Sequence, residues 1–346
     1  MALYNFTEPQ DGDKVATMAV VALAGAMSGL GLTVLRHLAS SPSNNKNNTH
    51  TFVILSRTPQ PAWTARGISV REVDYTSHPS LVEALQGDHT VLSFIGGSAS
   101  ALRNSQLALV SAAKEAGVQR FAPSEFALRG GGYGLDLYAG KREVWNAVVA
   151  SGMEYTRFSC GIFMGLLATG TPKGVTDVGA REGAGSGEEE ALAGLRPWNF
   201  VVNVKAGTAD LPGDGKGKVV FTDTRDVARF VEKALGMERW PEELGMRGDL
   251  MDWREMVAVL EEIQGRMFLV RENSVEDMER VAREVESKRF YNQVRVALVN
   301  GEGVVGDELN KAFPQVKPMD VKTFAKKWWD GVQVDEPQWE EDQSFM

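Results

Sequence analysis

The chain has 346 residues, of which 43% are hydrophobic, and its 37 basic and 46 acidic side chains leave a net charge of −9. An acidic chain without a cluster of lysine and arginine argues against a nucleic-acid partner, and its longest apolar run, residues 18–27, is too short to cross a membrane. The only cysteine, Cys160, excludes an intramolecular disulfide, and the N-terminus lacks a signal-peptide pattern, so we expect a cytoplasmic protein.

Residues 18–38 read as a buried strand, a glycine turn and an amphipathic helix. Gly25 allows a tight turn, and Gly29 or Gly31 lets the helix approach the sheet because glycine has no Cβ. The spacing fits either G-x-x-x-G-x-G or G-x-x-G-x-x-G with Ser28 in the middle place. Such a turn presents backbone N–H groups and the positive end of a helix to a pyrophosphate. The alternative is an ordinary connection that binds nothing. The strand before the turn and the helix and second strand after it make that less favoured.

The second expected strand, residues 51–58, ends in Ser56, Arg57 and Thr58. In a dinucleotide-binding fold this end faces the adenosine ribose, where a carboxylate would bind the 2′-hydroxyl of NAD. A guanidinium and two hydroxyls instead suit a 2′-phosphate, so the predicted cofactor is NADP(H). Alternatively, Arg57 only ends a strand at the surface.

Strand and helix patterns alternate through the rest of the first half. The other expected strands cover residues 67–75, 90–97, 119–126 and 154–159. The expected helices cover residues 81–85 with Ser80 as the cap, 100–116 with Gly117 at the end, and 141–151 with Gly152 at the end, and residues 130–134 form a flexible link. This alternation predicts an α/β fold with a doubly wound parallel sheet.

The second half is less regular. Residues 171–194, rich in Gly, Glu and Ala, are expected to form a mobile insertion or lid, and residues 218–235 return to a strand and a helix capped by Asp226. Later helices are expected at residues 253–263, 275–287 and 321–329. We predict a Rossmann domain at 1–160 and a smaller α/β substrate-binding domain at 161–346. Strands at about 197–235 would complete the first sheet.

Several motifs together resemble one family. They are the glycine turn, Phe94-Ile-Gly-Gly97, Arg120-Phe-Ala-Pro-Ser-Glu-Phe126 followed by Lys141, and Phe221-Thr-Asp-Thr-Arg-Asp-Val-Ala-Arg-Phe230. On these residues the chain resembles the NmrA-like, isoflavone-reductase-like branch of the atypical short-chain dehydrogenases, of the kind found in fungal secondary metabolism. Ser28 stands where members commonly have glycine, and Gly161 where ether-cleaving reductases often carry asparagine.

The resemblance implies a two-domain NADPH-dependent reductase acting on a small aromatic or polyketide-like molecule. The glycine turn would hold the pyrophosphate, Arg57 the 2′-phosphate, and Phe94 and Ile95 the nicotinamide side. The expected cofactor-binding residues are Gly25, Met27, Ser28, Gly29, Leu30, Gly31, Ser56, Arg57, Thr58, Asp74, Phe94, Ile95, Gly96, Gly97 and Lys141.

Lys141 is also the expected catalytic lysine. The Tyr-x-x-x-Lys motif of the main branch would need tyrosine at position 137, where Leu137 stands, and Tyr138 is one residue too close. An isolated lysine buried beside the nicotinamide could act as a general acid or base, or bind the substrate oxygen. A solvated helix lysine is the alternative. Ser124 is the second catalytic candidate, although it could equally fix its loop.

The residues expected around the substrate are Glu125, Phe126, Phe163 and Met164, with core packing as the alternative. Cys160 is expected to be buried and inert, and the four histidines suggest no metal site. Two other functions remain open: an NADP-sensing regulator without turnover, and a dehydratase or isomerase on the same fold. A homodimer is also left open.

Overall fold

The computed structural model describes residues 19–40, 50–132, 134–174, 176 and 185–340. Six parallel strands form the largest sheet, in the order β3-β2-β1-β4-β5-β6. Their bounds are β1 (Ala19–Ala24), β2 (His50–Ser56), β3 (Ser69–Glu72), β4 (Thr90–Ser93), β5 (Arg120–Ala122) and β6 (Glu154–Tyr155). This is the strand order of a Rossmann fold, and it confirms the predicted α/β class with a parallel sheet.

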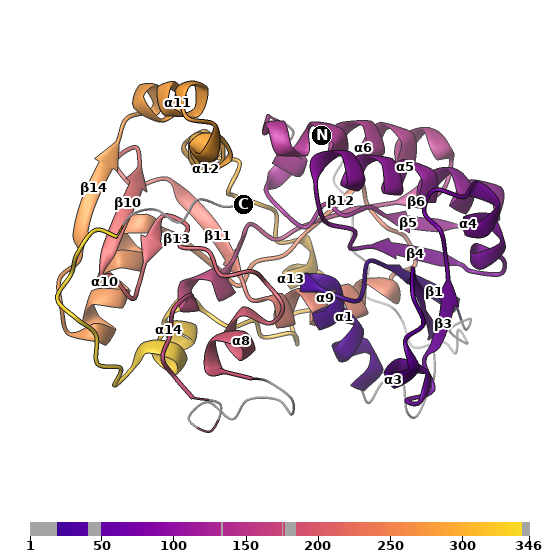
Figure 1. Ribbon diagram of the computed structural model, residues 1–346, viewed down its shortest axis with the longest axis horizontal. Coiled ribbons are helices and arrows are strands. Elements are labelled where there is room, and N and C mark those ends of the chain that lie inside the picture. Colours follow the sequence, from indigo (N-terminus) through magenta and orange to yellow (C-terminus); the bar gives the residue numbers. More distant parts are fainter. Residues whose placement is uncertain (1–18, 41–49, 133, 175, 177–184, 341–346) are drawn as a thin grey trace.

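Helices cover both faces of this sheet (Figure 1). One face carries α4 (His78–Leu85), α5 (Ala99–Glu115) and α6 (Ala139–Ser151), and the other carries α1 (Gly29–Ser40) and α9 (Thr224–Leu235). Adjacent strand residues point to opposite faces, so Ile54 packs with α1 and α9 whereas Val53 packs with α4, α5 and α6. The sheet is therefore doubly wound.

The second half of the chain builds smaller sheets. β7 (Arg157–Ser159) pairs with β12 (Glu243–Gly245), and β11 (Lys218–Thr222) lies between β8 (Ile162–Phe163) and β13 (Asp249–Asp252). β10 (Thr208–Pro212) lies between β9 (Val202–Asn203) and β14 (Leu269–Asn273). Their helices are α8 (Gly187–Leu192), α10 (Trp253–Gln264), α11 (Val275–Glu284), α12 (Glu286–Val299), α13 (Glu308–Ala312) and α14 (Val321–Trp329), and the short α3 (Pro61–Thr64) precedes β3.

The strands between residues 197 and 235 do not join the six-stranded sheet, contrary to our expectation. β11 pairs with β8 on one side and with β13 on the other, and neither of these strands belongs to the six-stranded sheet. The same stretch contributes α9, which packs on α1. The boundary between two domains near residue 160 stays a prediction.

Two helix caps also differ from the expected ones. Ser77 rather than Ser80 caps α4, and Asp223 rather than Asp226 caps α9, because these earlier residues are extended and accept hydrogen bonds from the first helical amides. The expected helix over 275–287 is interrupted at the extended Val285 and becomes α11 and α12. Within the described ranges, no helix has the length and apolar character needed to span a membrane.

Candidate cofactor-binding and active site

The glycine turn after β1 packs directly on the end of β4. A Cβ on Gly25 would lie 2.7 Å from the amide nitrogen of Ile95, and one on Gly31 would lie 2.6 Å from the carbonyl oxygen of Gly25. A Cβ on Gly29 would fit without a clash, so its φ of 54° is the reason that glycine is favoured there. Gly25 and Gly31, the two glycines with close contacts, are the first and third places of the G-x-x-G-x-x-G spacing. Its middle place is Ser28, which is exposed.

The end of β2 presents one arginine on a hydrogen-bonded turn. The Ser56 hydroxyl donates to the carbonyl of Thr58 at 2.7 Å and accepts from the side-chain amide of Gln60 at 3.1 Å. Ser56 therefore holds the turn and has no proton left to donate to a ligand. Arg57 is exposed and makes no hydrogen bond or ion pair with any residue that the structure describes. Its guanidinium is available to an anion.

The end of β3 adds Tyr75, which sequence reasoning did not select. Burial raises the pKa of its hydroxyl to about 12, against the opposing effects of the nearby Arg57 charge and the Gly25 backbone. The hydroxyl makes no hydrogen bond of good geometry within the described ranges. The expected Asp74 is exposed and accepts from the amide and hydroxyl of Thr76, which lowers its pKa. The carboxyl ends of adjacent parallel strands meet at one edge, a signal that could have pointed to Tyr75.

The loops after β4 and β5 are joined by Gln106, a second residue that we missed. Its side-chain oxygen accepts from the Ser93 hydroxyl at 3.0 Å and from the Ser124 amide at 2.8 Å. Gln106 thus orients the loop that carries Ser124, which is half-buried. Beside it, Phe126 stacks on Phe94 with ring centres 5.1 Å apart. Gly96 and Gly97, which come after Phe94 and Ile95 in the chain, are exposed.

Lys141 lies in the first turn of α6 and is only 5% exposed, which argues against a solvated lysine. Its ammonium lies 4.2 Å from the centre of the Tyr138 ring and forms no hydrogen bond or ion pair within the described part of the chain. The Lys141 charge acts on two neighbours, Glu125 and Cys160. Glu125 is fully buried, and burial raises the pKa of its carboxyl to about 7.

The residues expected around the substrate expose little of their surface, and their contact with a substrate stays a prediction. Glu125 and Met164 are fully buried and Phe126 is 9% exposed, so these three present little or no surface; Phe163 is half-buried. The reason is packing: Met164 lies in the core beneath α10 and α14, and Phe126 lies inside an aromatic stack.

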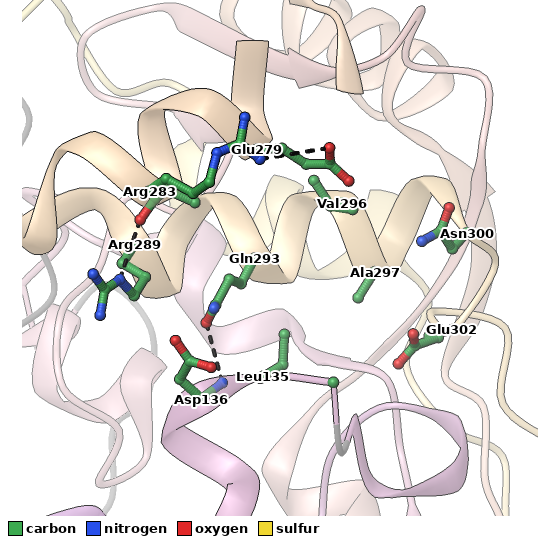
Figure 2. A pocket seen from close by; sticks show the side chains of 12 residues that line it. Leu135, Asp136, Glu279, Arg283, Arg289, Gln293, Val296, Ala297, Asn300 and Glu302 are labelled. Carbon is green, nitrogen blue, oxygen red and sulfur yellow. Dashed lines mark hydrogen bonds and ion pairs between the residues drawn. The ribbon is translucent and has the colours of Figure 1, made fainter. Parts of the chain in front are cut away.

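A groove of about 520 Å³ lies beside the turn that leads into α6 (Figure 2). Leu135 and Asp136 form one wall, and α11 and α12 form the other, where Gln293 points toward Asp136 and accepts from its amide at 3.2 Å. Val296 adds apolar surface, while the rim carries charges of both signs. The lining residues come from two distant stretches, so no local pattern predicted this groove.

Aromatic rings connect the groove side to Lys141. Tyr138, beneath the Lys141 ammonium, packs edge-on against Phe290 of α12 with ring centres 5.6 Å apart. Phe290 in turn stacks on Trp198 at 6.1 Å. All three rings are half-buried. We call Tyr138, Trp198 and Phe290 the aromatic wall.

The first half of the chain matches a known family. Residues 17–185 match the model of the NmrA-like family. They form an NmrA-like family domain. The chain is 28% identical over 263 residues to the oxidoreductase BOA1 of Botryotinia fuckeliana, covering 72% of this chain and 78% of that protein. It is 26% identical over 261 residues to the phenylcoumaran benzylic ether reductase TP7 of Nicotiana tabacum, covering 70% and 72%.

Among solved structures, one described as AtPrR2 with NADP⁺ and (+)pinoresinol is similar with a TM-score of 0.66 at 22% identity, covering 90% of this chain and 99% of that chain. At this identity the likeness shows the shared fold.

The predicted insertion reaches the glycine turn of the NmrA-like domain. Thr33 of α1 donates to the carbonyl of Ala193 at 2.5 Å, and a Cβ on Gly194 would lie 2.8 Å from the carbonyl oxygen of Gly29. Glu190 of α8 forms an ion pair with Arg225 at 2.6 Å. The end of the insertion is therefore docked on α1, whereas residues 175 and 177–184 lie outside the described residues.

Cys160 of the NmrA-like domain is fully buried, as predicted, and burial raises the pKa of its thiol to about 12. A thiol in that environment is a poor nucleophile. Across the described ranges, no group of three or more His, Cys, Asp or Glu side chains is arranged to hold a metal ion.

Proposed function

We propose that this protein is an NADPH-dependent reductase of a small aromatic or polyketide-like molecule. The observation that carries the proposal is the close packing of Gly25 and Gly31 on the end of β4, with the unpaired Arg57 at the end of β2. Names of relatives agree with it, since BOA1 is called an oxidoreductase, TP7 a reductase, and AtPrR2 was solved with NADP⁺.

The residues at the sheet edge fit this cofactor. The glycine turn would present backbone N–H groups at the N-terminus of α1 to a pyrophosphate, and Arg57 is the charged fork for a 2′-phosphate. The Tyr75 hydroxyl, without a well-formed hydrogen bond, is a further polar contact available there. When bound, the cofactor supplies the hydride. The chain itself must orient the substrate and manage the proton.

Lys141 manages the proton in this proposal. Its buried ammonium donates to the substrate oxygen on which negative charge develops, and the Tyr138 ring stabilises the ammonium through its π face. The hydroxyl of Ser124 is a second donor on the loop that Gln106 fixes. The aromatic wall packs against the rings of the substrate. The polar end of the substrate extends into the groove beside Asp136.

Two experiments test this function. Calorimetry should show that NADPH binds more tightly than NADH, and Arg57→Asp should remove the preference, with the exposed Arg66→Asp as the charge-matched control. Equal affinities in the wild type would contradict the assignment of Arg57. NADPH oxidation should then be followed with pinoresinol and a panel of aromatic ketones and enones. Lys141→Ala should lower kcat by about 10²-fold or more.

The same assays separate the other functions. Binding of NADPH without its oxidation by any substrate would favour a regulator. Conversion of a substrate without consumption of NADPH would favour a dehydratase or isomerase.

A further inference from the structure

Two hydrogen bonds hold the walls of the groove together. The amide of Asp136 donates to the side-chain oxygen of Gln293 at 3.2 Å, and the amide of Arg129 donates to the carbonyl of Glu302 at 2.9 Å. Leu135, which lies between Arg129 and Asp136 in the chain, lines the same wall. The groove is therefore preorganised, which lowers the cost of ordering it around a ligand.

One end of this groove carries hydrogen-bond acceptors that have no partner. Figure 2 shows the side chains of Asn300 and Glu302 at this end, where the chain leaves α12. Neither side chain makes a hydrogen bond or an ion pair with a residue that the structure describes. Glu302 is half-buried, and burial raises the pKa of its carboxyl. Arg129, although its backbone contacts Glu302, forms no ion pair with that carboxylate.

The cations that line the groove lie at its other end and already have partners. Figure 2 shows Arg283 and Arg289 away from Glu302. Arg283 lies 4.0 Å from the carboxylate of Glu279, and Arg289 lies 2.8 Å from that of Glu286. Neither arginine is therefore left to neutralise Glu302. A half-buried carboxylate without a counter-charge favours a ligand that brings a positive charge.

We propose that the aromatic substrate carries a protonated amine, which Glu302 and Asn300 bind at the end of the groove. The proposal rests on the proposed function, because it names the polar group of that substrate. An ammonium supplies N–H donors for both acceptors and the positive charge that Glu302 lacks. Leu135 and Val296 contact the carbon atoms between the amine and the ring. The carboxylate of Asp136, which also has no described partner, adds attraction for a cation.

Binding of two probes of matched shape tests the amine site without turnover. The probes are 4-methoxybenzylamine and 4-methoxybenzyl alcohol, titrated into the full chain and followed by ligand-observed NMR. The amine should bind about tenfold more tightly than the alcohol, and Glu302→Gln should remove most of that difference while the alcohol binds as before. Glu276→Gln, an exposed change on α11 outside the groove, controls for the overall negative charge and should alter neither affinity. Equal affinities of the two probes in the wild type, or an amine affinity that Glu302→Gln does not change, would overturn the proposal.

Turnover of a matched pair of ketones connects the amine site to the reaction. With 4-(aminomethyl)acetophenone, Glu302→Gln should raise KM about tenfold and leave kcat unchanged, because the lost contact lies away from the reacting carbonyl. With 4-(hydroxymethyl)acetophenone, the same variant should behave as the wild type. An equal rise in KM for both ketones would indicate a merely structural effect and refute the proposal. Absence of NADPH oxidation with every compound of the panel would refute the reductase function instead, while the two probes still decide the amine site.

Discussion

The burial of Glu125 leads to a prediction about stability that can be tested without a substrate. Replacing Glu125 by Gln keeps the shape of the side chain and removes its ability to ionise. In the unfolded chain the carboxyl ionises near its ordinary value of 4.5, whereas in the folded protein it keeps its proton until about pH 7. Between these values the folded state binds more protons than the unfolded state. Glu125 therefore lowers the free energy of unfolding progressively as the pH rises from 4.5 to 7, and by a constant amount above 7.

The size of the effect follows from the same shift. A raised pKa of this extent corresponds to about 3 kcal/mol of lost stability above pH 7, taken as an upper limit because the folded protein can relax around the charge. Of this, about 2 kcal/mol is already lost at pH 6. Glu125→Gln should therefore gain stability relative to the wild type, and the gain should be about 1 kcal/mol larger at pH 8 than at pH 6.

Urea denaturation followed by tryptophan fluorescence at pH 6, 7 and 8 measures this difference. Glu302→Gln is the control, because burial also raises the pKa of that carboxyl but leaves it partly exposed, so its pH-dependent gain should be smaller. A gain for Glu125→Gln that is the same at every pH would show that the carboxyl is ionised throughout. The burial argument would then be wrong.

Three further outcomes are expected. Gly31→Ala should destabilise the protein by about 1–3 kcal/mol in the same denaturation assay, because its Cβ would meet backbone atoms, whereas Gly134→Ala, with open space around it, should change little. Val296→Trp should raise KM several-fold by filling the groove, while Val299→Trp on the same helix, outside the groove, should not; equal KM values would exclude the groove from substrate binding. Cys160 should react with a thiol reagent only on unfolding, and rapid labelling of the native protein would contradict its burial.

Much of the fold and part of the candidate site could be read from local pattern. The strand, turn and helix around Gly25 were predicted because alternation, apolar runs and glycine positions report on backbone conformation within a few residues. Helix α14, at Val321–Trp329, fell on its predicted range for the same reason. Helix caps were harder to predict. Ser80 and Asp226 were expected where Ser77 and Asp223 are the caps, because several polar residues near a helix start can accept hydrogen bonds from the first amides.

Other features depended on segments that meet only in the folded molecule. No local pattern shows that β11 pairs with β8 and β13, or that Leu135 faces α12 across a groove. Glu125 was expected to touch substrate, yet its surroundings come from α6, β7 and β12 as well as its own loop, and together they bury it completely. Apolar periodicity and side-chain alternation are properties of neighbours in sequence, so the sequence alone predicted the doubly wound sheet and the glycine turn. Burial and charge at a point are sums over every element that reaches it, so only the tertiary structure decided what lies beside Lys141.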